Sequence, residues 1–142
     1  MASPRLPHPA YLAPGIPLGK KVLVIEKEAK DREHFSSILR QHGFVVNECD
    51  SPAQGVSLVG EEKYDFILVE QGSHAFEGRA VLERVLELDR HLPTVVLTRC
   101  VDMDCYLEAM QMGAIDYLEK PISDEDILKV VETHLQLPHL AA

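Results

Sequence analysis

Short apolar runs alternate with amphipathic segments from Lys20 onward, and five such rounds follow one another along the chain. The runs carry Val, Ile and Leu at consecutive positions, which is typical of parallel strands that are covered on both faces. Five strands are predicted, over 21–25, 45–49, 66–70, 94–98 and 114–118. Right-handed crossovers between them most simply give an α/β fold with a doubly wound parallel sheet of order 2-1-3-4-5.

Residues with special backbone preferences mark the ends of several predicted helices. Ser51 followed by Pro52 predicts the cap and first turn of the second helix. Gly43 and Gly113 predict the ends of the first and fourth helices, because glycine readily adopts the left-handed conformation that ends a helix. The acidic run that begins at Asp124 places negative charge at the positive end of the fifth helix.

Apolar spacing predicts which helical residues face the sheet. The third helix, over 80–89, is expected to turn Val81, Val85 and Leu86 inward. The methionines near the fourth helix, over 103–112, are expected to pack in the interior, because flexible methionine side chains fill gaps in cores. The remaining predicted inward residues are Phe35, Ile38 and Leu39, the methionines Met103, Met110 and Met112, and Ile127, Val130, Val131 and Leu135.

Composition indicates one domain flanked by two tails. Residues 1–19 hold five of the nine prolines without apolar periodicity, which predicts an extended tail before a domain over 20–137 and a short tail over 138–142. The net charge of -9 argues against direct contact with nucleic acid. No apolar run approaches the roughly 18 residues that a membrane-spanning helix needs, so we expect no membrane partner.

The three cysteines and seven histidines form no pattern typical of a binding site. An odd cysteine count indicates free thiols and a cytoplasmic location. A metal site at Cys100 and Cys105 is a weak alternative, because Cys-x4-Cys lacks a second pair. The histidines are interpreted as surface residues, and the sequence predicts no metal site among them.

Charged and hydroxyl residues stand at the carboxyl ends of four predicted strands. They are Glu26 and Lys27, Glu70, Thr98 and Lys120. Because the carboxyl ends of parallel strands meet at one edge of a doubly wound sheet, these side chains are expected to share a crevice.

Four segments around these residues resemble response-regulator receiver domains of two-component phosphorelay systems. They are VLVIEKE at 22–28, YDFILVEQ at 64–71, VVLT at 95–98 and DYLEKPI at 116–122. The resemblance implies a flavodoxin-like, three-layer receiver fold. In that family an acidic pair ends the first block, the phosphorylated aspartate ends the second, and a lysine lies in the last. The resemblance also implies a cis bond between Lys120 and Pro121.

The departures from the family pattern bear on its chemistry. The acidic pair is replaced by Glu26 and Lys27, and Glu70 stands at the phosphoacceptor position. With Lys120, this degenerate phosphoacceptor pocket has a formal charge of zero, whereas a typical pocket needs a divalent cation. The Lys27 ammonium is expected to pair with Glu70 or Glu26 where the metal would lie. Mg²⁺ binding is therefore expected to be weak or lost, with no cofactor required.

Three further residues are expected to shape the pocket. Arg99, beside Thr98, is expected to add charge and bulk at the pocket mouth. Glu70 carries one negative charge and a longer side chain than aspartate, so it is expected to mimic an acyl phosphate in part. In the family's phosphorylated arrangement Thr98 turns toward the phosphate, and Tyr117 would be the switch aromatic that packs inward.

The sequence therefore predicts a pseudo-receiver with no catalytic residue: a non-enzymatic signalling domain, not phosphorylated, that contacts proteins through its fourth helix, fifth strand and fifth helix. The expected partners are a histidine kinase, a phosphotransfer protein or an output protein, and a homodimer is possible. One alternative is a flavodoxin-like binder of a small ligand or cofactor, although EKEAKD at 26–31 lacks the Gly- and Ser-rich loop that would hold a flavin phosphate. Another is a receiver phosphorylated on a different carboxylate, such as Glu26 or Glu28.

Overall fold

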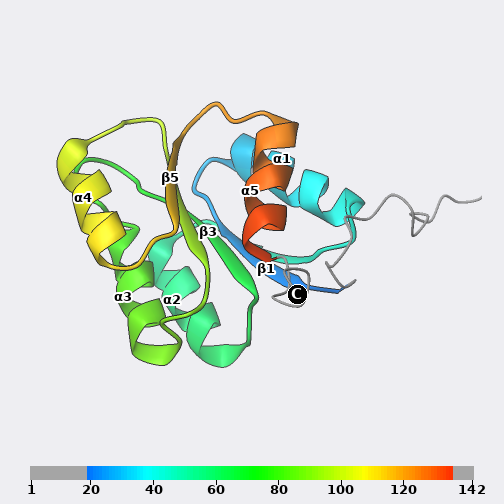
Figure 1. The fold of residues 1–142 in the computed structure, drawn as a ribbon, viewed down its shortest axis with the longest axis horizontal. Helices are drawn as coiled ribbons and strands as arrows, with labels where there is room; N and C mark the ends of the chain where they lie inside the picture. Colours follow the sequence, from blue (N-terminus) through cyan, green and yellow to red (C-terminus); the bar gives the residue numbers. More distant parts are fainter. Residues whose placement is uncertain (1–18, 136–142) are drawn as a thin grey trace, which may run out of the picture.

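Five parallel strands form one sheet of order β2-β1-β3-β4-β5 in the computed structural model, which describes residues 19–135 (Figure 1). The predicted strand order is confirmed. The predicted tails, apart from Gly19, lie outside the described residues. The strands are β1 (Lys21–Ile25), β2 (Val45–Cys49), β3 (Phe66–Glu70), β4 (Thr94–Thr98) and β5 (Asp116–Glu119).

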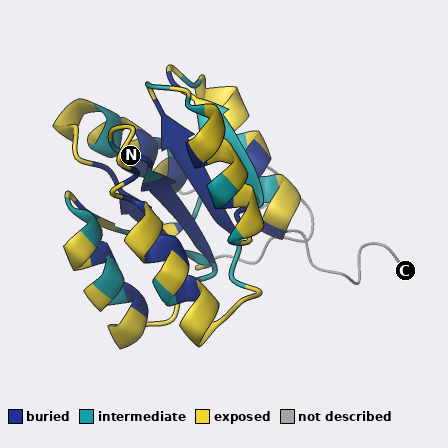
Figure 2. Ribbon diagram, turned by 90° about the vertical axis from the view of Figure 1, so that its left-hand side faces the viewer, coloured by how far each residue is buried: buried dark blue, intermediate teal, exposed yellow. Residues whose placement is uncertain are grey.

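Five helices cover the two faces of the sheet and bury its strands between them (Figure 2). On one face of the sheet, buried strand residues such as Leu23 pack against α2, α3 and α4. On the other face, buried strand residues such as Val22 pack against α1 and α5. Side chains alternate between the faces of a strand, so each β-strand feeds both clusters. The helices are α1 (Ala29–Gln41), α2 (Pro52–Glu61), α3 (Arg79–Leu88), α4 (Met103–Gln111) and α5 (Asp124–Leu135).

The predicted helix ends are confirmed at both glycines. Gly113 adopts φ +96 after α4, and Ala114 donates its N–H to the Ala109 carbonyl at 3.0 Å, which completes a Schellman motif. This motif also explains one error: the fifth strand begins at Asp116, not at Ala114 as predicted. The N–H of Ala114 closes the helix and is therefore not available to the sheet.

The predicted inward faces of α3 and α4 are only partly correct. Leu86 is exposed, because the inward face of α3 is formed by Val81, Leu82 and Val85. Met103 and Met110 are also exposed. The buried face of α4 consists of the small residues Cys105 and Ala109, which leave room for a close approach to the sheet. Met112 packs against the core as predicted.

The predicted inward residues of α1 and α5 are confirmed, with Ile38 only partly buried. None of the helices in residues 19–135 is both long and apolar enough to cross a membrane.

Candidate functional site

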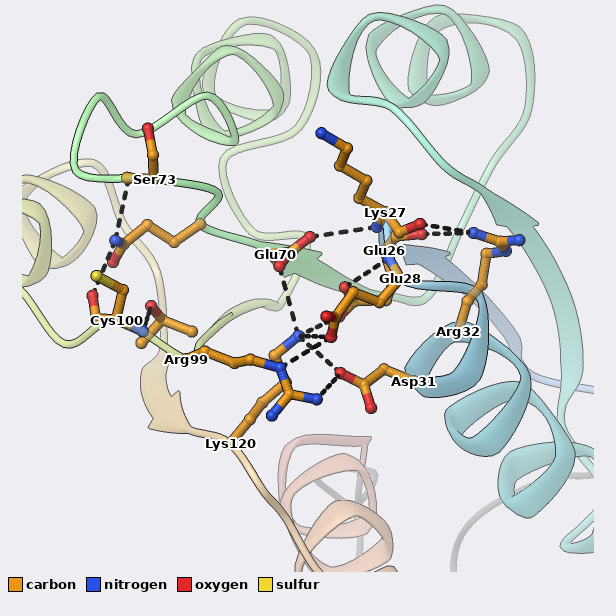
Figure 3. A network of polar contacts seen from close by, with 12 residues as sticks. Glu26, Lys27, Glu28, Asp31, Arg32, Glu70, Ser73, Arg99, Cys100 and Lys120 are labelled. Carbon is orange, nitrogen blue, oxygen red and sulfur yellow. Dashed lines mark hydrogen bonds and ion pairs between the residues drawn. The ribbon is translucent and has the colours of Figure 1, made fainter.

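The carboxyl ends of the strands bring together the side chains that the sequence placed there (Figure 3). Glu26 follows β1, Glu70 ends β3, Thr98 ends β4 and Lys120 follows β5. The parallel register aligns these ends, with Ile25 opposite Val69 and Glu70 opposite Leu97. Glu26, Glu70 and Lys120 therefore share one crevice, whereas the Thr98 hydroxyl bonds to the backbone of its own loop.

The ammonium of Lys120 lies at the centre of this crevice. Its Nζ is 2.9 Å from Glu26 Oε1, 3.0 Å from Asp31 Oδ2 and 3.5 Å from Glu70 Oε2. The Lys120 and Glu26 side chains are almost fully shielded from solvent, with 1% and 0% exposed. The bond from Lys120 to Pro121 is cis, as the resemblance implied. One lysine thus links carboxylates from β3, from α1 and from the end of β1.

Burial and partners set the charge states of this pair. Burial raises the pKa of Glu26, and a hydrogen bond with Glu70 raises it further. The pKa reaches about 7, although the neighbouring Lys120 lowers it. Burial alone would lower the pKa of Lys120, but hydrogen bonds to Glu26 and Asp31 outweigh it and raise that pKa. Lys120 therefore stays charged, while Glu26 can take up a proton near neutral pH.

Lys27 reaches Glu70 in a different way from the one predicted. Its backbone N–H donates to Glu70 Oε1 at 3.2 Å. Its side chain is exposed and points away from the carboxylates (Figure 3). The expected pairing through the ammonium is therefore wrong. The cation among the carboxylates is that of Lys120, whose Nζ is buried and whose chain enters from the opposite side of the crevice.

Arg99 lies at the crevice mouth and binds two acidic residues, Glu28 and Asp31, of which the sequence reasoning had given Asp31 no role. Its Nε is 2.8 Å from Glu28 Oε1, and its Nη2 is 2.7 Å from Asp31 Oδ2. Residues three apart share one side of a helical turn, so Glu28 and Asp31 both face the crevice from the start of α1. That spacing was the available signal. The predicted formal charge of zero is wrong, because four carboxylates face the two cations Lys120 and Arg99.

Carboxylates of Glu26, Glu28 and Asp31 approach one another closely enough to suggest a cation site. One oxygen from each lies within 4.8 Å of the others, and carboxylate oxygens are the ligands that Mg²⁺ prefers. However, Lys120 or Arg99 lies within 3.0 Å of an oxygen of each of the three. An ion that used these oxygens would first have to displace Lys120 or Arg99 from them.

A second polar chain runs from the crevice to α4. Tyr117 donates its hydroxyl hydrogen to Gln71 Oε1, and its hydroxyl oxygen accepts the Asp102 N–H at 3.2 Å. Gln71 is fully buried directly after Glu70, and sequence reasoning missed it. Thr98 is also fully buried, and its Oγ1 accepts the Cys100 N–H at 2.8 Å. The hydroxyl of Tyr117 thus lies inward and joins β3 to the start of α4.

A parallel 2-1-3-4-5 sheet that carries acidic residues, a threonine and a lysine at its strand ends is the architecture of a signalling receiver. The family model of the response regulator receiver domain matches residues 22–132. The chain therefore belongs to the response regulator receiver family. This favours the receiver interpretation over the flavodoxin-like cofactor binder.

Individual relatives agree with this assignment. The probable transcriptional regulatory protein SilR of Salmonella typhimurium is 27% identical over 116 residues, which are 82% of this chain and 51% of SilR. Sporulation initiation phosphotransferase F of Bacillus subtilis is 20% identical over 120 residues, which are 84% of this chain and 97% of that protein. The chain spans only about half or about a quarter of the length of several curated relatives.

Solved structures show the same fold. The CheY-like receiver domain protein of Methanospirillum hungatei superposes with a TM-score of 0.80 at 18% identity, over 87% of this chain and 99% of that one. HP1043, an orphan response regulator of H. pylori, superposes with a TM-score of 0.74 at 25% identity, over 84% of this chain and 99% of that one.

Proposed function

We propose that this receiver domain does not accept phosphate and acts by contacting a protein partner through α4, β5 and α5. The observation that carries the proposal is Glu70 at the acceptor position, held by Lys120 and by the Lys27 N–H. The polar groups around Glu70 are already bonded to its carboxylate. A phosphodonor would have to displace them before an in-line attack could begin.

The charges around Glu70 also oppose phosphoryl transfer. Transfer depends on cations that neutralise the donor phosphate and the charge developing on it, a role that Mg²⁺ fills at such sites. Here Lys120 and Arg99 already form ion pairs with Glu26, Glu28 and Asp31, so their charges are not available to a donor phosphate. Lys27 replaces an acidic residue of the family pattern, so the ligand set for the metal is incomplete.

An exposed apolar stripe on α4 supports the docking face. Met103, Leu107 and Met110 recur at helical spacing, so they share one side of the helix. Tyr106 packs edge-on against Tyr117 of β5, with ring centroids 5.5 Å apart. Large exposed apolar residues gathered in this way mark protein contact sites. The stripe and its neighbours are Val101 (54% exposed), Met103 (66%), Tyr106 (39%), Leu107 (47%) and Met110 (36%).

The partner that suits this face is a histidine kinase, a phosphotransfer protein or an output protein. The Tyr117 hydroxyl donates a hydrogen bond to Gln71, which directly follows Glu70, so Tyr117 connects the docking face with the crevice. The arrangement of Glu70 and Lys120 therefore stabilises one position of Tyr117, and the partner recognises that position without a phosphorylation step.

Phosphorylation tests the proposal directly. Incubation of the full chain with acetyl phosphate and Mg²⁺ should add no phosphate mass, because Glu70 and its neighbours leave no place for donor and metal. In Lys27→Asp/Glu70→Asp the acidic pair and the acceptor aspartate are restored, and phosphate should appear on residue 70. Intact-mass spectrometry followed by peptide mapping measures both outcomes.

Arg99→Ala in the double variant should raise the rate further, because the mouth of the crevice loses bulk and a cation that competes with Mg²⁺ for the carboxylates. Lys63→Asp/Glu70→Asp is a matched control, since Lys63 is an exposed lysine before the start of β3, whereas the crevice lies at the other end of that strand. Phosphate on Glu70 of the wild type would overturn the proposal. Phosphate on Glu26 or Glu28 would show instead a receiver that uses another carboxylate.

A further inference from the structure

Cys100, His74 and Asp102 form a chain of three side chains outside the acidic crevice. Cys100 Sγ lies 3.0 Å from His74 Nε2. The other ring nitrogen, Nδ1, is hydrogen-bonded to Asp102 Oδ2. His74 comes from the loop between β3 and α3, and the other two come from the loop between β4 and α4. A thiol, a base and a carboxylate that orients the base are therefore aligned in space.

The Asp102 carboxylate is held in place because it also caps α4. Asp102 is the N-cap of α4, and its Oδ1 accepts the Cys105 N–H at 3.1 Å. Its other oxygen, Oδ2, is the one that binds His74. Hydrogen bonds from His74 and from the Cys105 N–H lower the pKa of Asp102, so it is ionised at neutral pH. The cap thus holds a charged acceptor against Nδ1, which leaves Nε2 directed at the sulfur.

The other two cysteines contrast with Cys100. Cys49 and Cys105 are buried, and burial raises the pKa of each thiol. Cys100 is only partly buried, and the His74 side chain beside it is 65% exposed. The thiolate is the reactive form of cysteine, and access to it limits reaction. Of the three thiols, only Cys100 combines access with a neighbouring base.

We propose that Cys100 is a reactive thiol that is modified by small-molecule disulfides, with His74 as its base and Asp102 as the positioning residue. His74 Nε2 takes the thiol proton, and the Cys100 thiolate attacks one sulfur of the disulfide. A mixed disulfide forms on Cys100 while the sulfur–sulfur bond of the reagent breaks. The departing thiolate takes the proton from His74. Cys100 is oxidised and half of the reagent is reduced, so no further reactant is needed.

An adduct on Cys100 would lie where the second polar chain meets α4. The Cys100 carbonyl accepts a hydrogen bond from Gln71 Nε2 at 3.1 Å, and the Cys100 N–H binds Thr98. Modification would therefore add bulk to the loop that begins α4. The proposal itself depends only on the three side chains, so it stands or falls separately from the function proposed for the crevice.

Glutathione disulfide is a suitable probe with the full-length chain. The rate of mass gain, followed by intact-mass spectrometry and assigned by peptide mapping, should show modification at Cys100 ahead of Cys49 and Cys105. A free thiol is only a few per cent ionised at pH 7, so His74→Gln should slow the reaction about tenfold at that pH. Asp102→Asn should slow it less, because asparagine preserves the helix cap but not the charge.

The pH profile separates a base from a merely structural residue. In the wild type the rate should begin to rise at a lower pH than in His74→Gln, because the variant lacks a base beside the thiol. His91→Gln, at another exposed histidine, is the matched control and should leave both rate and profile unchanged. Equal rates in the wild type and His74→Gln, or preferential modification of Cys49 or Cys105, would overturn the proposal. Circular dichroism checks that each variant is folded.

Discussion

Lys120 is the single residue on which the crevice depends most. Its buried ammonium is within 3.5 Å of Glu26, Asp31 and Glu70. Lys120→Met removes the cation and leaves the buried Glu26 without its ion-pair partner, so the free energy of unfolding should fall by about 3–5 kcal/mol. Urea denaturation at pH 8 measures the loss.

Two further variants make this test specific. Lys129→Met, at an exposed lysine of α5, should change stability by less than about 0.5 kcal/mol. Adding Glu26→Gln to Lys120→Met should recover part of the loss, because one of the unpaired charges is then absent. If Lys120→Met were no more harmful than Lys129→Met, the ion pairs would contribute little to the fold.

Glu26 should make stability depend on pH. Its pKa is about 7 in the folded protein, against an ordinary value of 4.5, so between these values the folded state binds more protons than the unfolded chain. The free energy of unfolding should therefore fall as pH rises from about 4.5 to about 7, by up to about 3 kcal/mol. Glu26→Gln has no proton to lose there, and its stability should change less over the same interval.

Urea denaturation at several pH values compares the two proteins, and the difference between their slopes isolates Glu26. Glu61→Gln, at an exposed glutamate at the end of α2, is the control and should follow the wild type. A Glu26→Gln profile with the slope of the wild type would show that Glu26 titrates at its ordinary pKa.

At the scale of elements, the sequence predicted the strands and their order because apolar runs and terminating glycines are local signals. Four strands have the predicted bounds, and the error in β5 arises from a helix-ending hydrogen bond that apolar patterning does not register. The errors at Leu86 and Met103 have a different cause. Both residues are apolar, and only the packing of α3 and α4 on the sheet decides which apolar residues remain exposed.

The site was predictable to the extent that strand ends define it. Glu26, Glu70 and Lys120 meet because the parallel sheet aligns the strand ends that carry them. The direction of the Lys27 side chain could not be predicted, since it depends on how the loop after β1 turns. The contribution of α1 through Asp31 was missed, although its spacing from Glu28 was a signal for it.

The apolar stripe of α4 yields a prediction about binding. Met103→Ser/Leu107→Ser should leave the free energy of unfolding within about 1 kcal/mol of the wild type, because both side chains are about half or more exposed. The same variant should lose its protein partner, since the apolar contacts that it supplies are gone. Affinity capture with quantitative mass spectrometry compares the proteins retained by the wild type and by the variant.

Leu86→Ser/Leu88→Ser on α3 is the matched control, because these leucines are 41% and 48% exposed. It should retain the proteins that the α4 variant loses. Equal losses from both variants would show that exposed apolar surface in general, and not α4, determines what is captured.

The whole molecule is a three-layer sandwich with its chemistry gathered at one edge of the sheet (Figure 1). The crevice, the Gln71–Tyr117 contact and the Cys100 loop all include residues that follow the carboxyl ends of β1, β3 or β4. A change at any of these three places therefore alters the same few loops.

The buried position of Lys120 has a consequence for how the protein responds to its surroundings. A bound ion obeys mass action, so its occupancy rises and falls with the ion's concentration. A lysine side chain is part of the protein, so its presence in the crevice does not depend on the concentration of any ion. A buried pair is also only weakly screened by salt. The positive charge of Lys120 in this crevice is thus fixed by the sequence and does not vary with the concentration of metal ions around the protein.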